Sequence, residues 1–460
     1  MKAFADLSAL VQVGIRNGVL NPSGNLADFE APTSEKAALA EAGLLGLMSR
    51  AGANSQEVAP IEQAPAETQR IAEKAAAPLL EAIDRKQTEI VLEWASAGAK
   101  KGMVAPHVVL NRLLDLLPRH LQTISPVLGT RGKWLADLQE IKLDAIEDTP
   151  EEAFKKDPVA FREKLSESYE EMDWQERVKA LEALKLSPGP EDIAILQKGL
   201  VDRRQEVRHM SAELLSDLGQ SNFCRELYGL AQSFLKIEKS LLRRKLVVYP
   251  PEADGVPKSI QGGSRLVTSL GPRAQALYDV VRFVRPDLWN VALECTPEQL
   301  TDLASNTDYA EALIAAWLDA TLRFRSQLWL DYFFEISLDT KHHFVHGAIS
   351  QLTEYTTQEN YESVVGQRLR RQKGQMDHAV YTSILYSKRF SPAFSAVVVN
   401  AMKSGAYSAT HYGFLGNRLD VSVLPILQQD WGDDPDAVML RAAWLETVSL
   451  RRRLLDSLES

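Results

Sequence analysis

Apolar side chains that recur at helical spacing constrain the fold of this chain more than any other feature. Between residues 205 and 218 the inward-facing positions are Val207, Met210, Ser211, Leu214, Leu215 and Leu218. That spacing places them on one face of an α-helix. Similar stripes recur along almost the whole chain, separated by glycine or proline. Because a short helix cannot bury such a stripe alone, the pattern predicts antiparallel helix pairs that stack on their neighbours.

The segment 174–219 has the clearest local pattern. A helix ends near Pro188, a second begins at Pro190, and a tight turn leads into a third. The turn and the third helix carry Asp202, Val207 and Arg208, which resemble the acidic turn residue and the Val-Arg pair of a HEAT repeat. We expect Asp202 to cap the third helix, whose first N–H groups lack partners, and Arg208 to reach the turn of a stacked neighbour.

Breaks in the helical pattern divide the chain into five segments. These are a helical appendage at 1–50, an Ala/Pro/Gln-rich linker at 51–68, the first half of a HEAT-like array at 69–248, a Pro/Gly-rich loop at 249–273, and the second half of the array at 274–460. No alternation of polar and apolar residues is strong enough to predict a strand. The predicted fold class is therefore all-α: an ARM/HEAT-like α-solenoid of stacked antiparallel helix pairs with a small N-terminal helical appendage.

Charge and cysteine content narrow the functional class. The 460 residues carry a formal net charge of -10, and residues 137–176 hold fourteen acidic and five basic side chains. That window is interpreted either as a solvated surface or as an acidic docking strip for a basic partner. The overall acidity argues against non-specific nucleic-acid binding. Two cysteines without a C-x-x-C pair, no signal-peptide pattern and no spanning apolar run predict a cytoplasmic protein without a membrane segment.

The segment Gly129-Thr130-Arg131-Gly132-Lys133-Trp134 invites comparison with a phosphate-binding loop. A Walker A loop needs four residues between its glycines and Ser or Thr after the lysine, and this segment has neither. We therefore predict a structural turn in which the two glycines take unusual backbone angles. Arg131, Lys133 and Trp134 are the candidate partner-binding residues, because the two cations suit carboxylates and Trp134 suits a hydrophobic contact.

Three further patterns allow alternative interpretations. His342 and His346 stand one helical turn apart, a spacing that suits a metal but also ordinary helix histidines. Basic clusters at 203–204, 243–245, 368–373 and 451–453 would bind phosphates only if they shared one face. An aromatic-rich zone is interpreted as core, with a partner groove as the alternative. It contains Trp317, Trp329, Tyr332, Phe333 and Phe334.

Several segments together resemble a bacterial family of uncharacterised proteins with an ARM/HEAT-type helical fold. They are Leu7-Ser8-Ala9-Leu10, Ser49-Arg50-Ala51-Gly52, Val104-Ala105-Pro106, Leu113-Leu114-Asp115-Leu116-Leu117, residues 126–135 and the unit at 174–219. The resemblance covers about the first half of the chain. Members of that family are often encoded beside MoxR-type AAA ATPases, von Willebrand factor A proteins and SWIM zinc-finger proteins. The resemblance thus implies an adaptor within an ATPase-driven assembly.

The sequence as a whole favours a non-enzymatic protein-binding scaffold or adaptor. A MoxR-type AAA ATPase or a von Willebrand factor A protein is the partner that the resemblance implies. No catalytic residue, cofactor or metal ligand is assigned. The alternative is a nucleic-acid-binding helical array of the DNA-glycosylase type, which needs a continuous basic groove.

Overall fold

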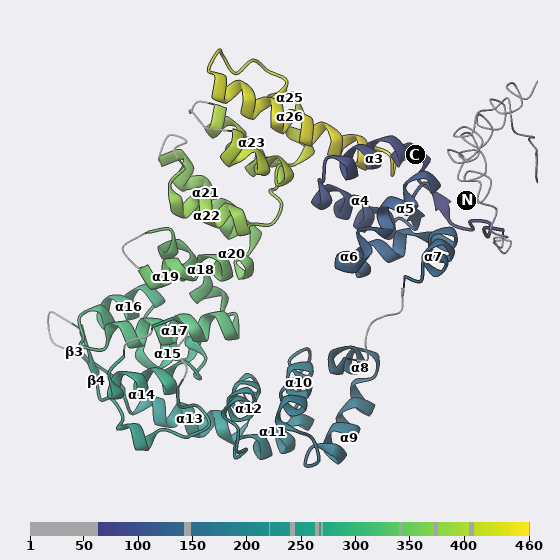
Figure 1. The fold of residues 1–460 in the computed structure, drawn as a ribbon. Coiled ribbons are helices and arrows are strands. Elements are labelled where there is room, and N and C mark those ends of the chain that lie inside the picture. Colours follow the sequence, from purple (N-terminus) through teal and green to yellow (C-terminus); the bar gives the residue numbers. More distant parts are fainter. Residues whose placement is uncertain are drawn as a thin grey trace, which may run out of the picture. The chain divides into compact units, whose positions relative to one another are not determined.

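The structure is a computed structural model, and it describes residues 63–141, 149–219, 221–239, 244–262, 266–267, 270–339, 343–371, 376–403 and 409–459. The chain divides into two units between Pro65 and Ala66, and almost all described residues belong to the second. They are mostly helical (Figure 1). The prediction of a mainly helical protein is therefore confirmed. The predicted appendage at 1–50 and most of the linker at 51–68 lie outside the described residues.

The first block, residues 66–141, is built around one apolar core. Its elements are β1 (Arg70–Ile71), α3 (Ala76–Asp84), α4 (Thr88–Lys100), β2 (Met103–Val104), α5 (Leu110–Leu114), α6 (Leu117–Ile124) and α7 (Gly129–Leu138), with 3-10 turns at Glu73–Ala75, His107–Val109 and Ser125–Val127. The two short strands pair in parallel. Trp94 of α4 is completely buried in the core that these elements share.

The second block consists of five helices, of which the first three begin at strong capping residues. They are α8 (Pro150–Lys156), α9 (Pro158–Ser168), α10 (Trp174–Leu184), α11 (Ile193–Gly199) and α12 (Gln205–Asp217). Thr149 and Asp157 accept backbone N–H bonds at the starts of α8 and α9, and Asp173 forms a capping box with Glu176 at α10. Such side chains satisfy N–H groups that would otherwise lack partners. A small core of its own joins α8 to α12.

A β-hairpin follows, where helix had been predicted. After α13 (Asn222–Gln232), strand β3 (Leu235–Lys239) pairs antiparallel with β4 (Arg244–Val248). Leu235 lies opposite Val248 and Ile237 opposite Leu246, so the apolar side chains share one face, and Glu238 lies opposite Lys245 on the other. The expectation that no segment forms a strand is therefore wrong here, because the alternation Leu-Lys-Ile-Glu-Lys that marks β3 spans only five residues.

The remaining helices enclose the largest core. They are α14 (Pro272–Val281), α15 (Pro286–Leu293), α16 (Pro297–Ser305), α17 (Ala310–Phe324), α18 (Gln327–Ser337), α19 (His343–Gly347), α20 (Ile349–Tyr355), α21 (Gln358–Arg371), α22 (His378–Tyr386), α23 (Pro392–Lys403), α24 (Ala409–Tyr412), α25 (Leu424–Leu427) and α26 (Pro435–Asp456). Trp317, Trp329 and Phe333 are completely buried there. The aromatic-rich zone is thus core, as predicted.

The described part of the Pro/Gly-rich segment 249–273 packs into this core. Val256, Ile260 and Val267 are buried with residues from both sides of the segment. Asp279 accepts the N–H of Gly262 at 2.8 Å, and the carbonyl of Gln261 lies 2.8 Å from His209 Nε2. These contacts fix the described part of the segment against α12 and α14.

The last helix also contributes to the core of the first block. Leu450, Leu454 and Leu458 are one turn apart along the chain end and are buried with residues of α3 and α4. Beside them, Arg451 is 3% exposed and makes two hydrogen bonds to Glu93, of 2.9 and 3.1 Å. The block 66–141 therefore shares a core with α26, whereas α8 to α12 have a separate one.

Candidate protein-binding surface

The α10–α12 unit (residues 174–217) is organised around Asp202, as the sequence suggested, but through other partners. Its side chain is 6% exposed and forms an ion pair of 2.6 Å with Arg177 of α10. The other carboxylate oxygen accepts the N–H of Arg204 at 2.8 Å. Helix α12 begins after Arg204 without a side-chain cap. Instead of the expected cap, Asp202 forms a bridge between the turn after α11 and helix α10.

Arg208 also differs from the expectation. Its guanidinium donates to the carbonyls of Asp202 and Arg203, at 2.8 and 3.0 Å, so it stabilises its own turn and does not reach a neighbour. The link between helix pairs comes instead from Arg177, which donates a hydrogen bond to the Tyr169 carbonyl. The Arg177 guanidinium also stacks over the Tyr169 ring, 5.1 Å from the ring centroid. Val207 is completely buried, as the stripe predicted.

A second arginine makes a similar link one helix earlier. Arg162 of α9 makes two hydrogen bonds to the buried Asp192, of 2.8 and 3.1 Å, and lies over the Phe154 ring at 5.0 Å. The hydrogen bonds that Arg162 donates to Asp192 raise the pKa of Arg162. The sequence analysis missed Arg162 and Arg177, since their carboxylate partners are 30 and 25 residues away and no local motif marks them. These arginines therefore tie α9 and α10 to the turns that precede α11 and α12.

Exposed carboxylates form a line on α9 and the turn that follows it. Glu163, Glu167 and Glu171 are exposed on α9 and the turn that follows it, at intervals of four residues. Four residues correspond to about one helical turn, so Glu163 and Glu167 lie on one face of α9 and Glu171 continues their line. None of the three forms an ion pair with a described residue. We call these three residues the acidic strip; Val159, 65% exposed, precedes it by one turn.

The candidate residues Arg131, Lys133 and Trp134 lie on α7, in the first block. The segment is a helix start, not a free turn: Gly129 has a positive φ of 64°, as expected, whereas Gly132 is helical and buried. Glu67 accepts the N–H of Arg131 at 3.2 Å, and the Arg131 guanidinium lies 2.8 Å from His107 Nδ1. Lys133 is exposed and Trp134 is half-buried.

The carboxylate of Glu67 sits at the start of α7. Partial burial works against its ionisation, but the N–H groups of Gln69, Arg131, Thr68 and Thr130 outweigh it and lower the pKa of Glu67. A Cβ at position 129 would lie 2.3 Å from a Glu67 oxygen, so a glycine is needed there. This part of the predicted partner surface therefore already binds a carboxylate of its own chain.

His346 and several arginines of the basic clusters make contacts within the chain. His342 lies outside the described residues, and His346 is 2.9 Å from the Ser337 carbonyl. No group of three potential metal ligands occurs in the described part of the chain. The last basic run pairs with carboxylates: Arg451 with Glu93, Arg452 with Asp456, and Arg453 with Glu81. Arg368 likewise pairs with Asp377, whereas residues 372–373 and Arg243 are outside the described ranges.

Comparison with known proteins places this mainly helical architecture in a family. The model of the family described as "Family of unknown function (DUF5691)" matches residues 6–153 and 151–458. The chain therefore belongs to that family. No curated protein and no solved structure matches the chain. In the described residues, no helix combines the length and apolarity needed to cross a membrane.

Proposed function

We propose that this protein is a non-enzymatic, cytoplasmic protein-binding adaptor that docks a basic partner on the acidic strip of α9. We further propose that its helix pairs form a HEAT-type solenoid. The observation that carries the proposal is that some charged side chains of α8 to α12 are paired within the protein and others are not. Arginine–aspartate pairs join these helices, whereas the exposed carboxylates of the acidic strip have no ion-pair partner among the described residues.

The chemistry of the strip defines the partner. Three carboxylates one turn apart match lysine or arginine side chains at similar spacing, and the exposed Val159 adds an apolar contact. Charged groups of this kind steer association and set specificity more than they add affinity. A basic helix or extended segment of a protein is therefore the occupant we expect. The family resemblance suggests a MoxR-type AAA ATPase or a von Willebrand factor A protein as its source.

The pairing of the arginines supports a protein partner over nucleic acid. A groove for phosphates needs arginines whose charge is available. Arg162, Arg177 and Arg451 are instead bound to Asp192, Asp202 and Glu93. The acidic strip would also repel a phosphate backbone.

Affinity capture with a matched charge control tests the proposal. The tagged full-length chain is compared with a strip variant, Glu163→Lys/Glu167→Lys/Glu171→Lys, and with a control variant, Glu226→Lys/Asp302→Lys/Glu354→Lys. Both variants change the net charge equally, and all six positions are exposed. We expect proteins captured from the source cells by the native chain and the control to be lost with the strip variant. Capture that survives in the strip variant, or that falls equally in both, would contradict the proposal.

A further inference from the structure

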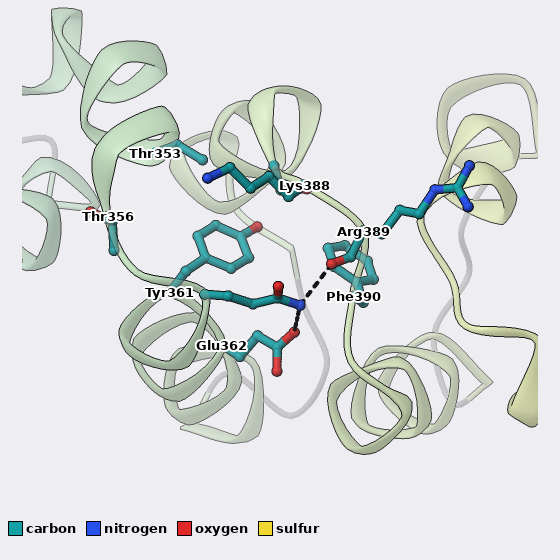
Figure 2. A pocket seen from close by; sticks show the side chains of 9 residues that line it. Thr353, Thr356, Tyr361, Glu362, Lys388, Arg389 and Phe390 are labelled. Atoms are coloured by element: carbon teal, nitrogen blue, oxygen red, sulfur yellow. Dashed lines mark hydrogen bonds between the residues drawn. The ribbon is translucent and has the colours of Figure 1, made fainter. Parts of the chain in front are cut away.

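A recess at the end of α20 is too small to hold a ligand. It lies beside the connector between α22 and α23, and Gln358 donates hydrogen bonds across it to Glu362 and to the Arg389 carbonyl (Figure 2). The part enclosed by protein has room for roughly one water molecule. The Arg389 side chain extends away from the recess and pairs with Glu93 of α4. The edge of the β3–β4 hairpin, in contrast, is long enough to receive another strand.

The hydrogen bonds between β3 and β4 determine which backbone groups of β3 point outward. The N–H of Tyr249 donates to the Phe234 carbonyl at 2.8 Å, and these two residues continue the register of the strands by one pair. In an antiparallel ladder such bonded positions recur at every second residue, so Lys236 and Glu238 bond to β4. The positions between and beside them direct their N–H and C=O groups away from β4. They are Leu235, Ile237 and Lys239.

This outward edge of β3 has no backbone partner in the part of the chain that the structure describes. The sheet there has two strands, and no described helix or turn bonds to the outward groups of β3. The opposite edge is less accessible, since β4 packs against α16 and Leu246 at its centre is 1% exposed. Ile237 at the centre of β3 remains partly exposed. An unpaired edge of this kind is a template for a further strand.

The solvent face of β3 carries opposite charges two residues apart. Lys236 and Glu238 are both exposed, and neither forms an ion pair with a described residue. Ile237 lies between them and points to the other face, because side chains alternate along a strand. The sequence Lys-Ile-Glu is therefore complementary to itself when two copies of β3 run antiparallel.

A single register of two antiparallel β3 strands pairs these charges. A two-fold axis at Ile237 places each Lys236 directly opposite Glu238 of the second copy. An axis at residue 236 would bring two lysines together, and an axis at residue 238 two glutamates, and like charges directly opposite each other are destabilising. The axis at Ile237 also brings the outward N–H and C=O groups of the two strands together as bonded pairs. Charge and hydrogen bonding thus favour the same arrangement.

We propose that two copies of this chain associate through β3 and form one continuous sheet in the order β4, β3, β3, β4. Each Glu238 then lies between Lys245 of its own β4 and Lys236 of the second copy. The interface is isologous, as in most two-fold dimers. A pair of short strands is small beside the interfaces of tight complexes, so the dimer is weak and depends on protein concentration. This inference does not rest on the acidic strip or on the function proposed above.

Sedimentation velocity of the full chain with complementary charge variants tests the proposal. Over about a hundredfold range of protein concentration, we expect the native chain to pass from monomer to dimer. Lys236→Glu places two glutamates opposite each other and Glu238→Lys two lysines, so each variant alone stays monomeric. A mixture of the two variants restores both Lys–Glu pairs and forms a heterodimer. Glu354→Lys, at an exposed position on α20, is the charge control and dimerises like the native chain.

Cysteine crosslinking gives a second readout that does not depend on reversing a charge. Residues 236 and 238 of opposite copies have Cα atoms about 4.5 Å apart in this register, which suits a disulfide. A mixture of Lys236→Cys and Glu238→Cys therefore crosslinks on oxidation, whereas each variant alone does not. A native chain that stays monomeric, a dimer that persists in both charge variants, or a cysteine mixture without crosslinks would overturn the proposal.

Discussion

The α10–α12 unit and the junction between α4 and α26 use the same chemistry over very different sequence distances. Arg177 and Asp202 are 25 residues apart, whereas Arg451 and Glu93 are 358 apart. In both places a guanidinium binds a poorly exposed carboxylate at the edge of an apolar core. The α10–α12 unit is therefore held together by contacts between residues close in sequence, whereas the block 66–141 depends on contacts with the far end of the chain.

The largest effect should come from Glu93→Gln at the junction. This change leaves Arg451, which is 3% exposed, without its charged partner. Breaking a buried pair typically costs several kcal/mol, and we expect about 3 kcal/mol because Glu93 and Arg389 are partly exposed. Hydrogen exchange should accelerate in residues 76–138 and in 435–456 together. Faster exchange in the first segment alone would show that the block does not depend on α26.

Arg177→Met should have the next largest effect, within the α10–α12 unit. Asp202 would keep only the Arg204 N–H, at a loss of about 2 kcal/mol in stability, because Arg177 is a fifth exposed. We expect faster hydrogen exchange between residues 169 and 217 and no change in residues 76–138. Arg177→Lys should recover part of the loss, since lysine restores the charge but not the forked geometry.

Sequence patterns predicted one of these regions and not the other. The stripe from Val207 to Leu218 and the turn at Asp202 are local, so periodicity alone located α12 and its preceding turn. Glu93 and Arg451 each look like an ordinary helix-surface charge, because nothing within ten residues of either shows that they meet. The β3–β4 hairpin was missed for a different reason. Each strand has five residues, too few for the polar–apolar alternation to outweigh the helical pattern around it.

Acidification should weaken the contact between α12 and the Pro/Gly-rich segment. Burial lowers the pKa of His209, although the bond with the Gln261 carbonyl works against this. The unfolded chain therefore binds a proton near pH ~6.5 while the folded chain resists it, so stability is lost as the pH falls through that value toward the lower folded pKa. Urea unfolding at about pH 7.5 and about pH 5 should show a smaller difference for His209→Asn than for the native chain. Equal differences in the two proteins would contradict this role.

The candidate surface was predictable only in outline. The acidic excess of residues 137–176 is visible in the composition, but Glu152 pairs with Lys155 and Asp173 caps α10, so only part of that charge is available to a partner. Composition cannot make this distinction, because pairing depends on where each helix face points. Composition also could not show that Arg131 is already in contact with a carboxylate, because its partner Glu67 lies 64 residues earlier.

The smallest effect should come from Arg452→Ala, beside the junction. Arg452 and Asp456 are about half exposed and one turn apart on α26. Exposed pairs of this kind contribute little, so we expect a change below about 0.5 kcal/mol in thermal unfolding. A loss as large as that of Glu93→Gln would mean that the charge of the whole helix end, and not the buried pair, holds the junction.

Site-specific photo-crosslinking in the source cells tests the proposed docking surface most directly. A photoreactive amino acid replaces Glu167 in the acidic strip and, as the matched control, the exposed Glu354 on α20. We predict a discrete crosslinked protein partner from position 167 whose yield falls in the Glu163→Lys/Glu171→Lys background, and none from position 354. Crosslinks of equal yield at both positions, or at position 354 alone, would contradict the account.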